Sequence, residues 1–114
     1  MSVVHLHLHV RDPERSAHFY STFFGLRERV RHGDILFIGN VSLDLALAPD
    51  PNPATLPSWF HFGWRLPTAD QVRQTYERCR AGGVSMSQEL CEDPDFVVFR
   101  CKDLDGHTLE IYWE

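Results

Sequence analysis

Residues 3–26, VVHLHLHVRDPERSAHFYSTFFGL, contain the pattern that decides the fold. Apolar and polar side chains alternate strictly through residues 4–10, which is typical of a strand with one buried face. Asp12 can cap the free amides at the start of a helix, and Pro13 fits the first helical turn. Gly25 suits a left-handed helix end. The stretch therefore predicts a strand followed by a helix.

Short strands and turns follow this first pair of elements. The strand candidates lie around residues 27–31, in DILFIG at 34–39 and in VSLDLALA at 41–48. A segment with four prolines, PDPNPATLP at 49–57, predicts a linker without regular structure. Beyond the linker we expect a strand at 59–66, a helix at 68–83, and strands at 84–90, 95–101 and 107–113.

The element order is therefore β-α-β-β-β twice, which predicts an α+β fold. We expect a single domain over 1–114, with one βαβββ module at about 1–48 and a second at about 58–114. An offset of 56 residues aligns His5 with His61 and Tyr20 with Tyr76. Each module alone would leave a sheet face exposed, so we expect the two modules to pair.

Composition narrows the class of protein. Hydrophobic residues make up 43% and charged residues 24% of the chain, as in an ordinary globular domain. The net charge is −5 and Lys and Arg form no run, so we expect neither nucleic acid nor a membrane as partner. The N-terminal residues show no signal peptide pattern. Three widely spaced cysteines favour free thiols in a reducing cytoplasm.

Period-two alternation also sorts the strand residues into faces. The faces opposite the core then collect His5, Asp44, His61 and Glu110. Each module contributes one histidine from its first strand and one carboxylate from its last. The expected core face takes Val4, Leu6, Leu8, Val10, Val41, Leu43, Leu45, Leu47, Phe60, Phe62, Trp64, Leu66, Leu109, Ile111 and Trp113.

Two interpretations of these four polar residues stay open at this point. Two imidazoles and one or two carboxylates suit a divalent metal ion such as Fe(II), Mn, Ni, Zn or Co. Alternation along half-buried strands, however, also produces polar residues that simply face solvent.

Three stretches resemble the vicinal oxygen chelate superfamily, which includes glyoxalase I, extradiol dioxygenases, fosfomycin-resistance enzymes and bleomycin-resistance proteins. HLHLHVRDPERSAHFYSTFFGL resembles its opening strand and helix, and WFHFGWRL resembles the strand that opens its second half. DLDGHTLEIYW resembles its closing hairpin. Together the stretches span essentially the whole chain. They are specific for the superfamily and for no single reaction.

The resemblance implies that His5, His61 and Glu110 are metal ligands. Asp44 matches a fourth position, where glyoxalase I and related epimerases carry Glu. The residue here is one methylene shorter, so its ligation stays open. Dioxygenase and fosfomycin-type members lack this fourth ligand, which leaves a 2-His-1-carboxylate set with open positions.

The resemblance also implies that two βαβββ halves form one cleft between curved sheets. In short members of the superfamily the halves often come from different chains, and the proline-rich linker permits either arrangement. We expect a twofold homodimer with two equivalent sites. In each site, His5 of one chain would join His61 and Glu110 of the other.

Five further residues are expected on the cleft side. His7, one step along the same face from His5, could act as a general acid or base, or simply line the cleft. Arg65 and Arg100 could hold a carboxylate or phosphate, or pair with acidic residues. Trp59 and Tyr112 could form an aromatic wall for a small substrate, or pack at a dimer interface.

These expectations point to a metal-dependent enzyme acting on a small oxygen-bearing substrate. It would be a lyase or isomerase, or a dioxygenase, with His7 and Glu110 as its catalytic residues. The metal identity among Fe(II), Mn, Ni and Zn stays open. The first alternative is a metal-free protein that sequesters a small molecule, as bleomycin-resistance proteins do. The second is a structural or regulatory dimer with a vestigial site.

Overall fold

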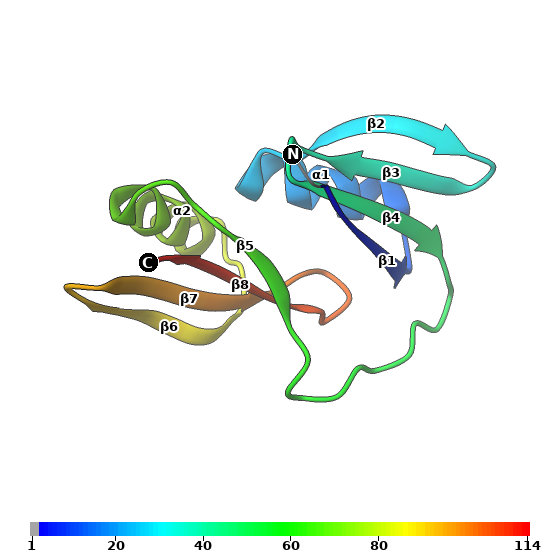
Figure 1. Ribbon diagram of the computed structural model, residues 1–114. Coiled ribbons are helices and arrows are strands. Elements are labelled where there is room, and N and C mark those ends of the chain that lie inside the picture. Colours follow the sequence, from blue (N-terminus) through cyan, green and yellow to red (C-terminus); the bar gives the residue numbers. More distant parts are fainter. Residues whose placement is uncertain (1–2) are drawn as a thin grey trace. The chain divides into compact units, whose positions relative to one another are not determined.

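The computed structural model describes residues 3–114 and shows two compact units. One unit extends to Ala54 and the other spans Thr55–Glu114. Each unit consists of one helix and one four-stranded mixed sheet (Figure 1). The element order is βαβββ in both, so the predicted α+β fold with two such modules is confirmed.

The first unit forms a sheet in the order β1-β4-β3-β2. β1 and β4 run parallel, and the other neighbouring strands are antiparallel. Its elements are β1 (Val4–Val10), α1 (Pro13–Phe24), β2 (Arg27–His32), β3 (Ile35–Gly39) and β4 (Leu43–Pro49).

The second unit repeats this topology with its sheet in the order β5-β8-β7-β6. β5 and β8 run parallel, and the remaining pairs are antiparallel. Its elements are β5 (Phe62–Arg65), α2 (Ala69–Ala81), β6 (Met86–Asp93), β7 (Phe96–Lys102) and β8 (Thr108–Trp113).

Local sequence signals begin and end the helices as predicted. The Asp12 side chain accepts hydrogen bonds from the backbone amides of Glu14 and Arg15 at 3.1 and 3.2 Å. Gly25 ends α1 with φ 71°, a left-handed conformation that favours glycine. The Thr68 hydroxyl accepts a hydrogen bond from the Gln71 amide at 3.2 Å and caps α2.

The topology places the first strand of each unit beside the last. β1 and β5 are edge strands, whereas β4 and β8 lie inside their sheets. A histidine on or just before the first strand therefore lies close to a carboxylate on the last. Both units share this order of strands, which positions the candidate site.

The expected core is correct at the centre of each sheet and wrong at some of its ends. Leu45, Leu109 and Ile111 are fully buried, as alternation predicts. Val41 is 76% exposed because it lies in a turn before β4. In this turn the Asn40 side chain accepts hydrogen bonds from the backbone amides of Ser42 and Leu43. The expected core residues that prove to be exposed or half-buried are Val4, Leu6, Val41, Phe60, Phe62, Trp64, Leu66 and Trp113.

The proline-rich segment beyond β4 has no helix or strand, as predicted. β4 ends at Pro49, and β5 begins only at Phe62. The second strand is therefore shorter than the expected 59–66, and His61 lies just before it. Of the helices in residues 3–114, none combines the length and the apolar character that crossing a bilayer requires.

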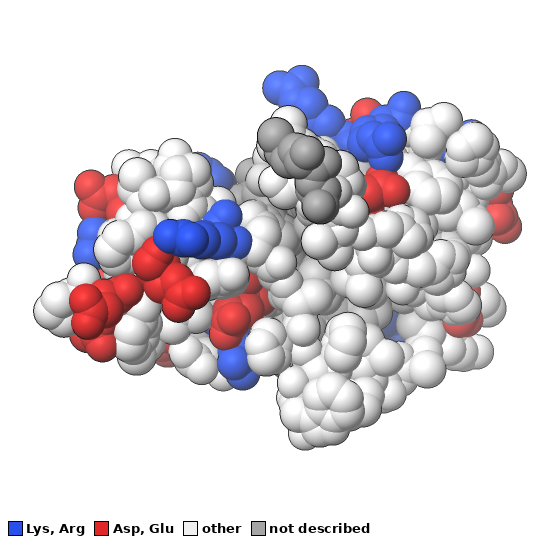
Figure 2. All heavy atoms as spheres, viewed as in Figure 1, with Lys and Arg blue, Asp and Glu red and all other residues white. Residues whose placement is uncertain are grey.

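Charges of both signs are interspersed over the molecule. On the face drawn in Figure 2, basic and acidic side chains lie close to one another. In the second unit Arg73 pairs with Glu92 and Arg80 pairs with Glu89, each at 2.8 Å. The expectation that nucleic acid is not a partner stays a prediction.

Candidate functional site

The first unit brings together His5, Asp44 and Arg29, which we call the first half-site. His5 on β1 lies directly opposite Asp44 on β4 in the strand register. Its Nδ1 lies 3.1 Å from Oδ2 of Asp44, and Arg29 of β2 donates to Oδ1 of the same carboxylate. The Phe37 ring stacks on the imidazole with centroids 6.3 Å apart.

These contacts fix which imidazole nitrogen of His5 is available. An ionised carboxylate only accepts hydrogen bonds, so Nδ1 of His5 carries the proton that Asp44 receives. In the neutral ring, Nε2 then keeps its lone pair. The His5 side chain is 55% exposed, so a ligand can reach it from solvent.

The second unit brings together His61, Glu110 and Arg100, which we call the second half-site. His61 Nδ1 lies 3.2 Å from the backbone carbonyl oxygen of Trp59, and its Nε2 lies 3.8 Å from Oε2 of Glu110. Two guanidinium nitrogens of Arg100 lie 3.0 Å from the other carboxylate oxygen, Oε1. Glu110 is on β8 and Arg100 is opposite it on β7.

The second half-site fits two ligands of one divalent metal ion. The Trp59 carbonyl accepts the Nδ1 proton, so the Nε2 lone pair of neutral His61 faces Oε2 of Glu110. Two ligands at about 2.1 Å from one ion lie about 3.0 Å apart in octahedral geometry and about 3.4 Å apart in tetrahedral geometry. The observed 3.8 Å needs only a small adjustment. His5, whose Nε2 is likewise available, is chemically suited to be a third ligand.

Each half-site borders a pocket within its own unit. Glu110 and Tyr112 line a cavity of about 340 Å³ in the second unit. Its other walls come from Phe96, Val98, Trp113 and Glu114, so apolar side chains and two carboxylates share the lining. Arg29 and Asp44 line a cavity of about 320 Å³ in the first unit, together with Val3, Asn40, Val41 and Leu43.

The other predicted site residues lie in varied surroundings. Arg65 donates to the backbone carbonyl of Glu114. The Trp59 side chain is 74% exposed and lines neither of these pockets, although its carbonyl holds His61. His7 lies on β1 beside His9, with ring centroids 5.2 Å apart.

His9 forms a third contact between a histidine and a carboxylate, again through Nδ1. That nitrogen lies 2.9 Å from Oδ2 of Asp50, just beyond β4. The hydrogen bond from His9, with a second from the Asn52 amide, holds the pKa of the Asp50 carboxyl below its ordinary value. β1 therefore presents a row of three histidines, two of which are oriented by acidic residues of the β4 side.

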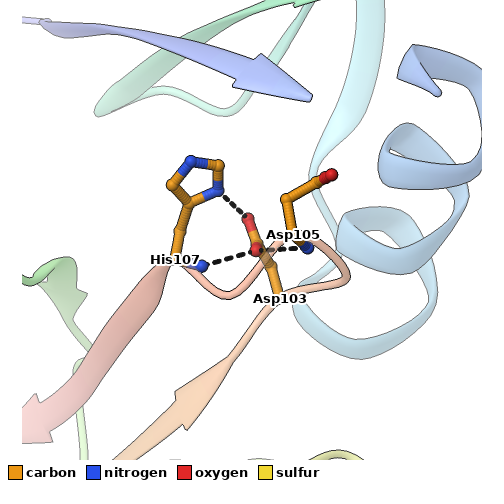
Figure 3. A group of neighbouring side chains, drawn as sticks. All are labelled: Asp103, Asp105 and His107. Carbon is orange, nitrogen blue, oxygen red and sulfur yellow. Dashed lines mark hydrogen bonds and ion pairs between the residues drawn. The ribbon is translucent and has the colours of Figure 1, made fainter. Parts of the chain in front are cut away.

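Asp103, Asp105 and His107 form a further group whose atoms could hold a metal ion (Figure 3). Their ligand atoms lie within 4.8 Å of one another. Both Asp103 oxygens already accept hydrogen bonds: Oδ1 from the amides of Asp105 and His107, and Oδ2 from the His107 ring at 2.8 Å. These bonds close the turn between β7 and β8 and so position the strand that carries Glu110.

Sequence reasoning missed several of these partners. Arg29 belongs to RERVRH, where arginine recurs at every second position of β2, and this signal was available. His107 follows Asp105 and Gly106 in the last turn, and its burial depends on Asp103. The Trp59 carbonyl leaves no signal in the sequence, because every residue has a carbonyl.

The chain matches the family model for the Glyoxalase/Bleomycin resistance protein/Dioxygenase superfamily over residues 2–111. It belongs to this superfamily. The first two motifs that suggested the resemblance lie within the matched residues, and the third lies within them as far as Ile111. No curated protein sequence matches this superfamily member.

Solved structures share the superfamily fold at low sequence identity. The fosfomycin resistance protein FosX from Listeria monocytogenes superposes with a TM-score of 0.84 at 18% identity, covering 98% of this chain and 92% of FosX. A superfamily protein from Alicyclobacillus acidocaldarius gives 0.80 at 19% identity, with 97% and 89% covered. A lactoylglutathione lyase from Agrobacterium tumefaciens gives 0.75 at 17% identity, with 97% and 92% covered.

Proposed function

We propose that this superfamily member is a metal-dependent enzyme for a small substrate with two neighbouring oxygen atoms. In this proposal His5, His61 and Glu110 hold one divalent metal ion, either Fe(II), Mn, Ni, Zn or Co. The observation that carries it is the second half-site, where His61 Nε2 faces Glu110 Oε2 while other groups hold the remaining polar atoms.

The donor set supports the metal assignment on chemical grounds. Each proposed histidine ligand donates its Nδ1 proton to an acceptor, which is the usual orientation of a metal-binding imidazole. Arg100 binds one Glu110 oxygen and leaves the other for the ion. When bound, such an ion supplies Lewis-acid stabilisation of negative charge on substrate oxygens.

Other residues of the chain have roles in binding and proton transfer. The pocket beside Glu110 combines the rings of Phe96, Tyr112 and Trp113 with the polar Glu114, so we propose that it takes a small substrate that has both an aromatic and a polar part. His7, two residues after His5 on the same face of β1, is the general acid or base. This set of roles fits a lyase, an isomerase or a dioxygenase, and structural relatives include proteins described as a lactoylglutathione lyase and a fosfomycin resistance protein.

The first test is the metal content of anaerobically purified protein. We expect about one metal ion per chain, and its identity distinguishes iron-dependent oxygen chemistry from isomerase or lyase chemistry. Glu110→Ala should remove the metal. Glu77→Ala, which deletes an exposed carboxylate of α2, is the matched control and should retain it. Wild-type protein that takes up no metal after reconstitution would refute the proposal.

The complete site is proposed to form between two copies of the chain. His5 of one protomer joins His61 and Glu110 of its partner, so a homodimer has two shared sites. Mixing His5→Ala with Glu110→Ala chains should then restore one intact site in each heterodimer, because one protomer keeps His5 and the other keeps Glu110. If mixing restores no metal binding while each variant remains folded, the shared arrangement is wrong.

A second candidate function is metal-free binding of a small molecule. Asp44 and Glu110 each contact an arginine and a histidine of the chain, and this observation favours the alternative. The arginine already balances the negative charge of each carboxylate, so no metal ion is needed for that purpose. Under this alternative, ligands would bind equally well to wild-type protein before and after treatment with a chelator. The enzyme proposal predicts that chelation abolishes turnover.

A further inference from the structure

We infer that Asp44 is a positioning residue for His5 and not a fourth metal ligand. This inference rests on the proposed function, because it assigns the role of Asp44 within the same metal site. It follows from the strand register, from the contacts of the Asp44 carboxylate and from the chemistry of imidazole.

The register shows that Asp44 and Glu110 are not equivalent positions. Asp44 lies directly opposite His5, whereas Glu110 lies opposite Gly63, two residues beyond His61. The residue of the first unit that matches Gly63 is His7, which lies opposite Ala46. Ala46 thus takes the place that Glu110 has in the second unit, and its methyl group cannot bind a metal.

Both oxygens of Asp44 are already engaged, and the one that contacts the imidazole does so at Nδ1 and not at Nε2. Oδ2 accepts the Nδ1 proton of His5 at 3.1 Å, and Oδ1 accepts from Arg29. The Asp44 side chain is only 19% exposed, compared with 55% for His5. β3 lies between β2 and β4, so the Arg29 side chain has to reach across β3 to contact Asp44. The β3 residue opposite Asp44 is Gly39, which has no side chain to block this path.

These contacts determine the chemistry of His5. A neutral imidazole has one N–H, and the group that accepts it decides which nitrogen has the lone pair. Asp44 accepts the hydrogen bond from the Nδ1 proton, so Nε2 is the nitrogen whose lone pair is left for the metal. Phe37 faces the ring with centroids 6.3 Å apart. Asp44, itself held by Arg29, orients His5 before any metal arrives.

This role limits the protein ligands to His5, His61 and Glu110. Two imidazoles and one carboxylate leave two or three open coordination positions on a five- or six-coordinate ion. Those positions are available to both oxygens of a chelating substrate. A fourth protein carboxylate would take one of them.

The test begins with the metal-free protein, so it is independent of the proposed function. Long-range proton–nitrogen NMR of ¹⁵N-histidine-labelled protein, at a pH where imidazole is neutral, should show His5 protonated at Nδ1. Asp44→Ala should convert a large fraction of His5 to the Nε2-protonated form. Asp34→Ala, an exposed acidic residue in the turn after β2, is the matched control and should leave the His5 signal unchanged.

Metal titration of the same proteins then separates a positioning residue from a ligand. Loss of a group that orients a metal-bound histidine weakens affinity by about 10- to 100-fold. Asp44→Ala should therefore bind Zn²⁺ more weakly but still reach the wild-type stoichiometry at saturation, whereas Glu110→Ala should lose the site.

Two results would overturn the inference: His5 protonated at Nε2 in the wild-type protein, or Asp44→Ala losing stoichiometric Zn²⁺ as Glu110→Ala does. Wild-type protein that binds no Zn²⁺ would refute the proposed function. In that case the NMR result still decides whether Asp44 orients His5.

Discussion

Replacing Asp103 by alanine tests whether the Asp103, Asp105 and His107 group is a structural turn or a metal site. The Asp103 side chain accepts three hydrogen bonds at 2.8 to 3.0 Å, and Asp103 and His107 are both buried. The substitution leaves two backbone amides and one imidazole nitrogen without this acceptor. At about 1 kcal/mol for each hydrogen bond, the free energy of unfolding should fall by about 3 kcal/mol.

The assay is denaturant unfolding followed by tryptophan fluorescence. All three tryptophans of the chain lie in the second unit, so this signal reports the unit that contains the turn. Asp95→Ala, an exposed turn substitution between β6 and β7, is the control and should change the free energy by less than about 0.5 kcal/mol.

Metal binding provides the second part of this test. If the turn is structural, Glu110→Ala protein with an intact Asp103 should bind no metal with defined stoichiometry. A loss of stability below about 1 kcal/mol for Asp103→Ala would contradict the hydrogen-bond argument. Stoichiometric metal in Glu110→Ala that disappears on adding Asp103→Ala would show that the turn, and not the proposed ligand set, is the metal site.

Three further predictions concern other parts of the chain. Cys91 is exposed and the other two thiols are buried. One thiol per native chain should therefore react with a thiol reagent, and three should react after unfolding. Fast reaction of two or more thiols in the native protein would contradict this burial. The carboxyl carbon of Asp50 should titrate in NMR with a lowered pKa, and His9→Ala should raise it. Because the folded-state pKa is lowered, this contact stabilises the fold above the unfolded-state pKa, and its contribution is lost as pH falls through the folded value. Gly63→Ala would place a Cβ 1.7 Å from the Glu110 carbonyl oxygen, so β5 and β8 would have to move apart. Hydrogen exchange of the β5 backbone amides should then accelerate, and metal affinity should fall. Unchanged hydrogen exchange in this variant would refute the prediction.

Alternation and helix caps made most of the fold predictable from the sequence. The hydrophobic pattern of β1, β7 and β8 is interpretable because each strand buries one face more than the other. Asp12 and Thr68 begin their helices through contacts that involve only near neighbours in the chain. Val41 was misassigned because a turn beside Asn40 interrupts the alternation just before β4.

The site was only partly predictable, for a specific physical reason. Period-two alternation decides which face a residue occupies, but a shift of two residues along a neighbouring strand preserves that face. The pattern therefore placed Asp44 and Glu110 on non-core faces without distinguishing their registers. The structure shows that Asp44 lies opposite His5 and that Glu110 lies two residues beyond the position opposite His61.

Local patterns could not show which carboxylate Arg29 and Arg100 would each contact. Arg29 lies 15 residues from Asp44 in the sequence, and Arg100 lies 10 residues from Glu110. Only the strand order brings each arginine to its carboxylate. The sequence left Arg100 open as a substrate-binding residue or as a partner of an acidic residue, and the structure shows it paired with Glu110, the proposed metal ligand.

Calorimetric titration of metal-free protein with Zn²⁺ tests the central claim most directly. Wild-type protein should bind one ion per chain, and His5→Ala, His61→Ala and Glu110→Ala should each lose that site, because the three residues are proposed to hold the same ion. Each variant should keep the wild-type circular dichroism spectrum. Unchanged binding in any of the three, or no binding by the wild-type protein, would contradict the account.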